Sequence, residues 1–462
     1  MKLPAYPTYK PSGVEWLGEV PEEWSLTRLK YVLDGPLKYG ANEAAELDDP
    51  DLPRYVRITD IDEADGLREE TFRSLPIDVA SEYLLREGDV LFARSGATAG
   101  KSFRYKSSWG TCAYAGYLIR ARLDGNRVRP DFVRYFTASA NYWQWISSSL
   151  IQATIQNVSA DKYASLWLPL PSLDDQQRIA SFLDRETGKI DTLVAKKRTL
   201  VERLKEKRTA LISRTVTRGL PPDAARAAGL DPHPKLKPSG IDWLGDIPAH
   251  WEVLPFTKYV ADKSDYRGKT PEKTEDGVFL VTAKNVRMGF IDYETSQEYV
   301  APDEYDEIMR RGLPKKGDIL FTTEAPLGNV ALVDREDVAL AQRIIRFRMN
   351  PARFSSGFTL YAMMSDHFQV QLQSLSTGST AEGLKASKLP ILRIIDPPLE
   401  EQKVIASFLD RETVRIDQMV AKVESVIERL QEYRTALITA AVTGKIDVRG
   451  SICEVPSRRT AG

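Results

Sequence analysis

The chain has 462 residues, and 64 lysines and arginines against 65 aspartates and glutamates leave a net charge of −1. This balance excludes a wholly basic nucleic-acid coat, but it allows a local basic patch. Two cysteines and three scattered histidines exclude a disulfide framework and a cysteine-rich zinc site, so we expect no metal. No stretch has the ~18 apolar residues of a membrane span, and the first residues lack the apolar core of a secretory signal, so we expect a cytoplasmic protein.

The predicted elements form two α/β domains that alternate with two long helices. In chain order we expect strands at 90–94 and 113–123, a helical stretch at 131–149, strands at 319–323 and 344–349, and a helical stretch at 359–375. The expected divisions are a globular domain (1–170), a helical region (171–218), a Pro/Gly/Ala-rich linker (219–237), a second globular domain (238–396), a second helical region (397–448) and a polar tail (449–462).

A tandem repeat underlies this order. PSGVEWLGEVPEEW at 11–24 and PSGIDWLGDIPAHW at 238–251 are identical at eight of fourteen positions, and IASFLDRET occurs at 179–187 and again at 405–413. The offsets of 227 and 226 indicate duplication of one unit. The segments between these landmarks diverge. The constant parts therefore perform one task twice, and the variable parts perform two different tasks.

The two helical regions carry apolar residues at heptad spacing, which predicts antiparallel coiled-coil packing. About 40 residues at 1.5 Å rise would make a helix of about 60 Å. The residues expected in the stripe, or in docking of a partner, are Leu183, Ile190, Leu193, Leu200 and Leu204, with Leu409, Ile416, Met419, Val423, Val426 and Leu430.

Catalytic motifs are absent. SGATAGKS at 95–102 approaches a phosphate-binding loop, but it has the wrong spacing and no helix is predicted after it, so we interpret it as a turn between strands. DPPL at 396–399 lacks the aromatic residue of the amino-methyltransferase motif. No Pro-Asp pair is followed within about 50 residues by the Asp/Glu-x-Lys of many nucleases. We therefore expect no catalytic residue and no enzyme activity in this chain.

Charge is distributed unevenly, which favours DNA binding. Residues 90–134 hold nine basic and two acidic side chains with aromatic residues among them, whereas residues 43–70 hold eleven acidic and three basic ones. Residues 338–353 hold four arginines and no acid. Basic and aromatic side chains together suit phosphate and groove contacts, although charge runs are also common on solvated faces.

The landmarks resemble the specificity (S) subunits of type I restriction–modification systems. The resemblance is carried by the two PSG-x-x-WLG segments, the Gln-containing helix starts LPSLDDQQRIASFLDRET and LEEQKVIASFLDRET, and the helix ends VTRG and VTGK, in family order over nearly the whole chain. It implies two target recognition domains, each reading one half of a bipartite double-stranded DNA target, separated by two antiparallel helices. Because the two domains differ, the implied target is asymmetric.

The resemblance also implies partners. The duplicated helices would dock two modification (M) subunits that bind S-adenosylmethionine and methylate adenine after flipping it out. Restriction (R) subunits would add translocation and cleavage driven by ATP and Mg. This chain would bind no cofactor itself and would not contact a membrane.

We chose candidate DNA-binding residues by side-chain type, since Arg and Lys suit guanine edges or phosphate, and Asn and Gln suit adenine. The alternative role of each is a surface salt bridge or a turn cap. The candidates are Arg57, Thr59, Arg94, Ser95, Lys101, Arg104 and Gln156 in the first domain, and Lys284, Asn285, Arg287, Thr323, Glu324, Arg343, Ser379 and Thr380 in the second.

Two other functions remain open from the sequence. A scaffold or regulatory homologue that organises proteins without binding DNA would lack salt-dependent affinity for duplex DNA. A stand-alone methyltransferase or nuclease would act without partners, and the missing motifs argue against it.

Overall fold

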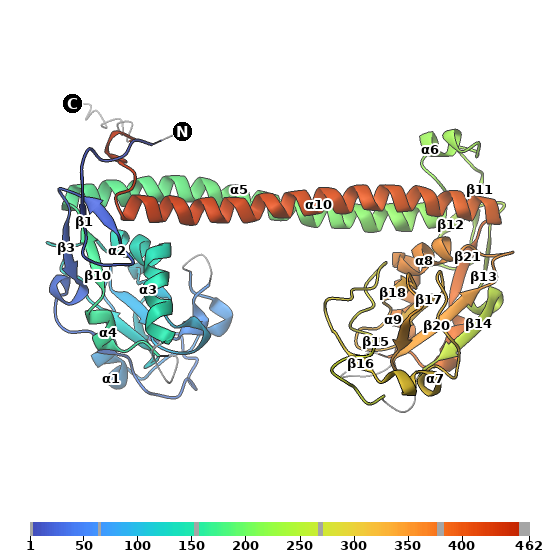
Figure 1. Ribbon diagram of the computed structural model, residues 1–462, viewed down its shortest axis with the longest axis horizontal. Coiled ribbons are helices and arrows are strands. Elements are labelled where there is room, and N and C mark those ends of the chain that lie inside the picture. Colours follow the sequence, from blue (N-terminus) through green and yellow to red (C-terminus); the bar gives the residue numbers. More distant parts are fainter. Residues whose placement is uncertain (1–2, 63–65, 152–156, 267–270, 377–382, 452–462) are drawn as a thin grey trace. The chain divides into compact units, whose positions relative to one another are not determined.

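The computed structural model describes residues 3–62, 66–151, 157–266, 271–376 and 383–451. The chain divides into two compact units, Met1–Lys197 with Ser425–Gly462, and Arg198–Glu424. Both long helices, α5 (Leu173–Arg218) and α10 (Leu399–Val442), contribute to both units (Figure 1). Each unit therefore combines one globular domain with the N-terminal half of one long helix and the C-terminal half of the other.

The first domain is built on a four-stranded antiparallel sheet in the order β4-β9-β6-β7. All four residues of β6 are buried, and alternate side chains enter two different hydrophobic cores. A continuous apolar run suits a strand whose two faces are both covered. The sheet strands are β4 (Lys38–Tyr39), β6 (Val90–Ala93), β7 (Ser102–Arg104) and β9 (Leu118–Ala121).

Three strand pairs complete the first domain. They are the antiparallel β1 (Tyr9–Pro11) with β2 (Glu19–Pro21), the antiparallel β3 (Ser25–Arg28) with β10 (Trp167–Leu170), and the parallel β5 (Arg54–Val56) with β8 (Cys112–Tyr114). The single strand predicted at 113–123 is therefore wrong. The chain leaves β8, turns where the Leu118 amide donates to the Ala115 carbonyl at 2.8 Å, and enters the other sheet as β9.

The second domain repeats this plan with longer strands. Its antiparallel sheet has the order β14-β20-β17-β18, and a second sheet has the order β16-β15-β19 with β15 and β19 parallel. The strands are β14 (Val260–Asp265), β15 (Val278–Val281), β16 (Tyr299–Val300), β17 (Ile319–Thr322), β18 (Val330–Leu332), β19 (Val338–Leu340) and β20 (Ile344–Met349). Two antiparallel pairs accompany them, β11 (Leu236–Pro238) with β12 (Asp246–Pro248), and β13 (Glu252–Pro255) with β21 (Arg393–Asp396).

The shorter helices follow the repeat as well. Each long helical stretch predicted in a domain is in fact two helices, because a serine interrupts it at Ser139 and at Ser365. The Ser365 hydroxyl accepts from the Phe368 amide at 3.4 Å and so caps the second helix of its pair. The helices are α1 (Ile77–Ala80), α2 (Pro130–Thr137), α3 (Ala140–Ile151), α4 (Ala160–Ala164), α6 (Pro222–Ala227, within the predicted linker), α7 (Tyr305–Ile308), α8 (Ser356–Met364) and α9 (Asp366–Leu375).

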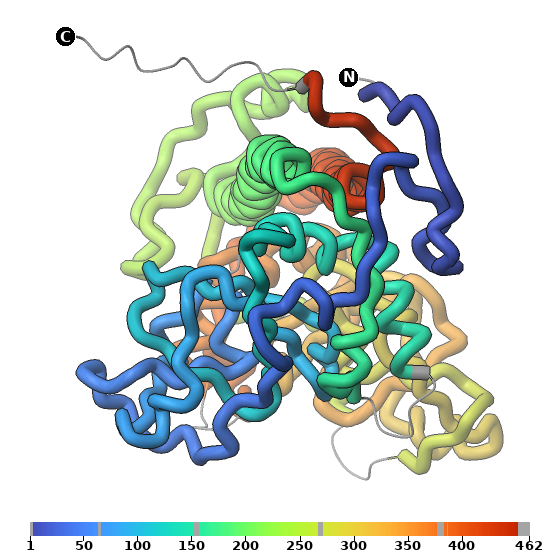
Figure 2. Tube along the Cα trace, turned by 90° about the vertical axis from the view of Figure 1, so that its left-hand side faces the viewer, coloured from blue at the N-terminus to red at the C-terminus, as the bar shows by residue number. Residues whose placement is uncertain are grey.

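The halves of α5 and α10 that share a unit run antiparallel. In the first unit they lie side by side (Figure 2), and the Arg434 Nε donates to the Asp191 carboxylate at 2.8 Å. In the second unit Arg208 and Asp417 form the equivalent ion pair at 3.0 Å. Each of these residues occupies the position that matches Arg434 or Asp191 in the other copy of the repeat. All four side chains are partly exposed, so these pairs contribute little stability and mainly favour one register.

The buried stripe of the long helices differs from the predicted one. Ile190 is 7% exposed, but the next buried positions are Val194 and Val201, whereas Leu193 and Leu200 remain 40% and 39% exposed. Val426 of α10 is likewise 40% exposed, so the prediction that these three residues pack in the seam is wrong. The other predicted residues are buried, namely Leu183, Leu409 and Ile416, or partly buried, namely Leu204, Met419, Val423 and Leu430.

The buried side of each long helix also includes a threonine that contacts a globular domain. The hydroxyls of Thr187 and Tyr135 lie 3.3 Å apart, and those of Thr413 and Tyr361 lie 3.2 Å apart in the other unit. Val194, four residues after Ile190, lies in a buried cluster against which Ile427 and Leu430 of α10 pack. Leu193, three residues after Ile190, is left towards solvent.

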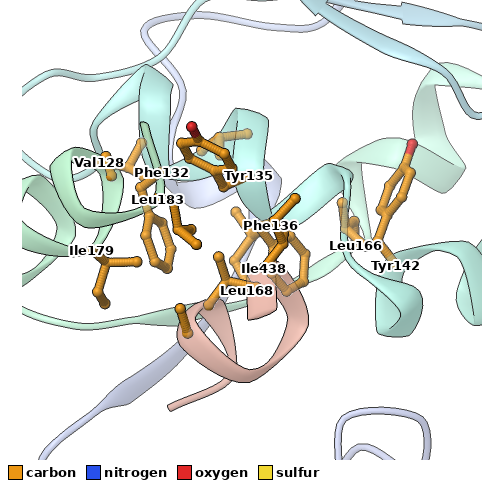
Figure 3. Close-up of a cluster of buried hydrophobic side chains, with 14 of the residues drawn as sticks. Val128, Phe132, Tyr135, Phe136, Tyr142, Leu166, Leu168, Ile179, Leu183 and Ile438 are labelled. Atoms are coloured by element: carbon orange, nitrogen blue, oxygen red, sulfur yellow. The ribbon is translucent and has the colours of Figure 1, made fainter. Parts of the chain in front are cut away.

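Each domain is fixed to its helices by the same set of contacts, which we call the seat. In the first seat, Phe132 and Phe136 of α2 gather with Leu183 of α5 and Ile438 of α10 (Figure 3). The Tyr135 hydroxyl donates to Asp184 at 2.6 Å, and burial raises the pKa of Tyr135 to about 12, so this hydroxyl remains a donor. The second seat repeats the contact between Tyr361 and Asp410 at 2.8 Å.

A buried glutamine closes each seat. Gln176 accepts from the Arg129 amide at 2.8 Å and donates to the carbonyls of Pro171 and Arg127. Gln402 accepts from the Ser355 amide at 2.9 Å and donates to the carbonyls of Pro397 and Arg353. Both side chains are fully buried. The glutamine of each helix start thus binds the loop before α2 or α8.

Candidate nucleic-acid interface

Three segments of the first domain meet at the end of the central strand β6. The Arg94 amide donates to the Tyr117 carbonyl at 3.0 Å, and the Arg94 carbonyl accepts from the Val158 amide at 2.8 Å. Ser95 forms an isolated bridge with Asn157. We call the residues displayed here, Tyr39, Arg94, Ser95 and Tyr117, the first strand-end surface.

The second domain brings together the equivalent segments at the end of β17. The Thr323 amide donates to the Arg343 carbonyl at 2.9 Å, and the Leu384 amide donates to the Thr323 carbonyl at 2.9 Å. Glu324 forms a bridge with Gly383. We call Glu324 and Arg343 the second strand-end surface. The backbone frame is shared between the domains, whereas the side chains it displays are different.

The first surface combines a cation with aromatic rings. The Arg94 guanidinium lies 4.9 Å from the centre of the Tyr39 ring, and Tyr39 and Tyr117 are 42% and 66% exposed. Lys101 is exposed at the far end of the turn from β6 to β7, which is the segment that approached a phosphate-binding loop. Exposed rings and cations of this kind can stack on bases and contact phosphates.

The second surface carries an ion pair in place of the rings. The Arg343 Nε lies 3.1 Å from a Glu324 carboxylate oxygen, and the two side chains are 48% and 42% exposed. Lys284 is exposed on the loop before Asn285, and this loop is tied to the β17–β18 turn because the Asn329 side chain donates to the Val286 carbonyl at 2.8 Å. Charged groups of both signs are therefore displayed near the strand end.

Several predicted residues support turns instead of forming a surface. Asn285 is fully buried: its side-chain oxygen accepts from the Thr282 amide at 2.9 Å, and its nitrogen donates to the Asp292 and Ser296 carbonyls. The structure therefore assigns Asn285 to the inside of its loop. In the matching turn of the first domain, Arg57 makes a two-point ion pair with Asp60, and Thr59 is exposed beside it.

Three further candidates form hydrogen bonds or ion pairs with residues of their own domain. Thr323 is buried, and its hydroxyl donates to the Arg343 carbonyl at 3.2 Å, so it supports the surface from below. Arg104 bridges Glu87 and Asp131, and Arg287 lies 3.5 Å from Asp292. These pairings fit the alternative role of salt bridge or turn support.

Part of the predicted basic patches is engaged in ion pairs inside the domains. Arg122 pairs with buried Asp89 at 2.8 Å. In the second domain the fully buried Arg346 donates to Asp318 at 3.0 Å and to Asp262 at 2.6 Å. The hydrogen bond from Arg346 lowers the pKa of Asp262 below its usual value. Charge counted along the sequence therefore overstated the basic surface.

The candidates Gln156, Ser379 and Thr380 lie outside the described residues. Sequence reasoning missed Tyr39, because its place beside Arg94 depends on the pairing of β4 with the distant β9. Tyr117 was noticed only as one aromatic among several; its offset of 226 residues from Arg343 is the signal that could have selected it.

Neither a metal centre nor a membrane span is found in the part of the chain that the structure describes. No group of three or more His, Cys, Asp or Glu side chains there could hold a metal ion. Every helix within the described ranges is too short or too polar to cross a bilayer.

Comparison with known proteins identifies the family. The type I restriction modification DNA specificity domain matches residues 43–203 and again residues 269–429. The MjaVIII specificity subunit of Methanocaldococcus jannaschii is 24% identical over 440 residues, which cover 93% of this chain and 94% of the relative. The EcoKI specificity subunit of Escherichia coli K12 is 20% identical, and the match covers 93% of this chain and 90% of that one.

A solved structure shares the fold. It comes from work on the structural basis of complex assembly and conformational transition of the type I R-M system, and it matches with a TM-score of 0.67 at 16% identity, over 92% of this chain and 99% of the other. The relatives favour the specificity role over a scaffold without DNA binding. Because the specificity domain occurs twice and covers well over half of the residues, the chain belongs to the family of DNA specificity subunits of type I restriction–modification systems.

Proposed function

We propose that this chain is the non-catalytic subunit that selects the DNA sequence for a type I restriction–modification complex. The observation that carries the proposal is the pair of strand-end surfaces, which share one backbone frame but display Arg94 with Tyr39 and Tyr117 in one domain and Glu324 with Arg343 in the other. Equivalent frames with different side chains suit two readers of different half-sites.

Each domain would read one half of an asymmetric, bipartite target in double-stranded DNA. Cations such as Lys101 and Lys284 would contact phosphates and position the domain, while the strand-end side chains would contact base edges. The seats support this role, because they hold each reading surface rigidly on its pair of helices through buried contacts such as Tyr135 with Asp184.

The long helices would dock two M subunits. Leu193, Val426 and Tyr433 of the first unit are 40%, 40% and 56% exposed, and Leu200 of the second unit is 39% exposed. Apolar side chains left towards solvent at heptad spacing suit the apolar face of a partner helix. The M subunits would supply S-adenosylmethionine and adenine methylation, and R subunits would supply cleavage driven by ATP and Mg. The chain itself would bind none of these cofactors.

Genome-wide mapping of methylated adenine tests the proposal. The M partner is expressed in cells with and without this chain. We expect marks that depend on the chain and that lie in an asymmetric motif of two parts separated by an unread gap. The absence of such marks, while M is expressed and bound to the chain, would contradict the proposal.

A further inference from the structure

Glu324 and Arg343 form a pair whose chemistry matches one base pair. This inference rests on the proposed function and adds the identity of a base pair that the second domain reads. We infer that Glu324 and Arg343 together recognise a single G·C pair in the second half-site, with Arg343 on guanine and Glu324 on cytosine.

The backbone holds Arg343 in place for this role. Its carbonyl accepts from both the amide and the hydroxyl of Thr323, at 2.9 and 3.2 Å, and Thr323 is buried. The side chain therefore leaves a strand end that is anchored from inside the domain. Because a reader must be held within a fraction of an ångström of its base, this anchoring suits recognition more than a loose surface charge.

Arg343 also adopts a backbone conformation that is unusual for its residue type. Its φ angle is +77°, in the left-handed region that favours glycine, and a long side chain there costs folding free energy. The equivalent residue of the first domain, Tyr117, is not among the residues with positive φ. Strain of this kind persists at functional sites, where the direction of the side chain matters more than the local cost.

The carboxylate of Glu324 narrows the choice of base. An exposed carboxylate on a DNA-binding surface is repelled by the phosphates, and a hydrogen bond that it accepts from a base would offset this cost. In the major groove, cytosine N4 and adenine N6 are the donors, but the N7 acceptor beside adenine N6 would repel a carboxylate, so cytosine is the better partner.

Arg343 completes the pair on the other strand. Its guanidinium can donate two parallel hydrogen bonds to guanine O6 and N7. Of the described residues, only Glu324 is seen to form an ion pair with Arg343, and this contact uses Nε and one carboxylate oxygen. The two outer nitrogens of Arg343 and the second oxygen of Glu324 therefore offer donors next to an acceptor. A G·C pair presents the complementary set, with acceptors on guanine next to a donor on cytosine.

The first domain cannot read in the same way. Ser95 occupies the position of Glu324, and Tyr117 occupies that of Arg343, so the first surface has no carboxylate at the strand end. The inference is therefore specific to the second half-site, and the first domain supplies a matched control.

The test uses the complete chain with its M partner and reads the methylation motif base by base. Arg343→Gly should leave thermal unfolding unchanged or raised, because glycine accepts φ +77° without strain. It should reduce discrimination at one G·C position by roughly ten- to a hundredfold. Glu324→Gln should shift the preference at that same position from cytosine towards adenine, since an amide can bond to adenine N6 and N7.

Two controls separate the possible roles. Arg343→Lys keeps the charge but not the fork of donors, so full discrimination by this variant would make Arg343 a phosphate contact and overturn the inference. Tyr117→Ala should alter only the other half of the motif. An unchanged motif in both Arg343→Gly and Glu324→Gln would also overturn it. Failure of the wild-type complex to yield a two-part motif would instead refute the proposed function.

Discussion

Removal of the Gln402 side chain is the sharpest test of the seats. Gln402 is fully buried at the start of α10 and joins that helix to the loop before α8. Gln402→Ala deletes one accepted hydrogen bond, from the Ser355 amide at 2.9 Å. It also deletes donated bonds to the carbonyls of Pro397 and Arg353 at 2.8 and 3.4 Å and to the Asp396 carboxylate at 3.2 Å. The variant leaves these buried backbone groups without their partner.

The expected cost follows from these bonds. Each hydrogen bond contributes about 0.5–1.5 kcal/mol net, and a buried donor left unsatisfied costs about 1–3 kcal/mol, so we expect a loss of about 3–5 kcal/mol in the unfolding free energy of the second unit. For a unit of this size, this corresponds to a fall of about 10 °C in the midpoint of its thermal unfolding. Hydrogen exchange at the Ser355 amide should accelerate in parallel, because the group that protects it is gone.

The repeat supplies the matched control. Gln176→Ala removes the equivalent bonds of the first seat, including the Arg129 amide at 2.8 Å, and should destabilise the first unit instead. Gln402→Glu should destabilise the second unit at least as much as Gln402→Ala, because a buried carboxylate cannot donate to the carbonyls and would face the Asp396 carboxylate, which accepts from Gln402 at 3.2 Å. A change below about 1 kcal/mol in Gln402→Ala would refute the reasoning.

Three further outcomes are expected. Leu193→Asp combined with Leu200→Asp should leave the fold intact, because both side chains are exposed, yet abolish association with M in size-exclusion chromatography; assembly like that of the wild type would contradict the docking proposal. Arg94→Ala should weaken duplex DNA binding by the assembled complex and alter the first half of the motif, with assembly intact; unchanged affinity and motif would exclude Arg94 from the interface. The second unit should lose stability as the pH falls below about 4. Arg346 holds the pKa of Asp262 below its usual value, so the folded state favours the charged carboxylate. The stability that this carboxylate contributes is present above its unfolded pKa and is lost when Asp262 becomes protonated. Asp262→Asn should flatten this acid dependence in thermal unfolding scans, and an equally steep dependence in the variant would refute the assignment.

The candidate interface was partly predictable because some of its residues directly follow recognisable strands. Arg94 and Ser95 come after the apolar run of β6, and Glu324 comes two residues after the end of β17. Their meeting with Tyr117 and Arg343 could not be predicted, because those residues directly precede the neighbouring strands β9 and β20 and are distant in sequence. Asn285 was chosen for its amide, but the same amide satisfies the inside of a turn, and sequence does not distinguish these two uses.

The duplication, the two long helices and the family can all be recognised in the sequence, because identical segments at one offset and apolar heptads are properties of residue order. The fold is needed to establish which heptad positions are buried and which cations remain available. Leu193 is exposed and Val194 is buried because Val194 lies in the cluster against which Ile427 and Leu430 of the other long helix pack. Arg346 is internal because Asp262 and Asp318, distant in sequence, surround it with carboxylates. Burial depends on neighbours that the fold brings together, so residue order alone does not contain it.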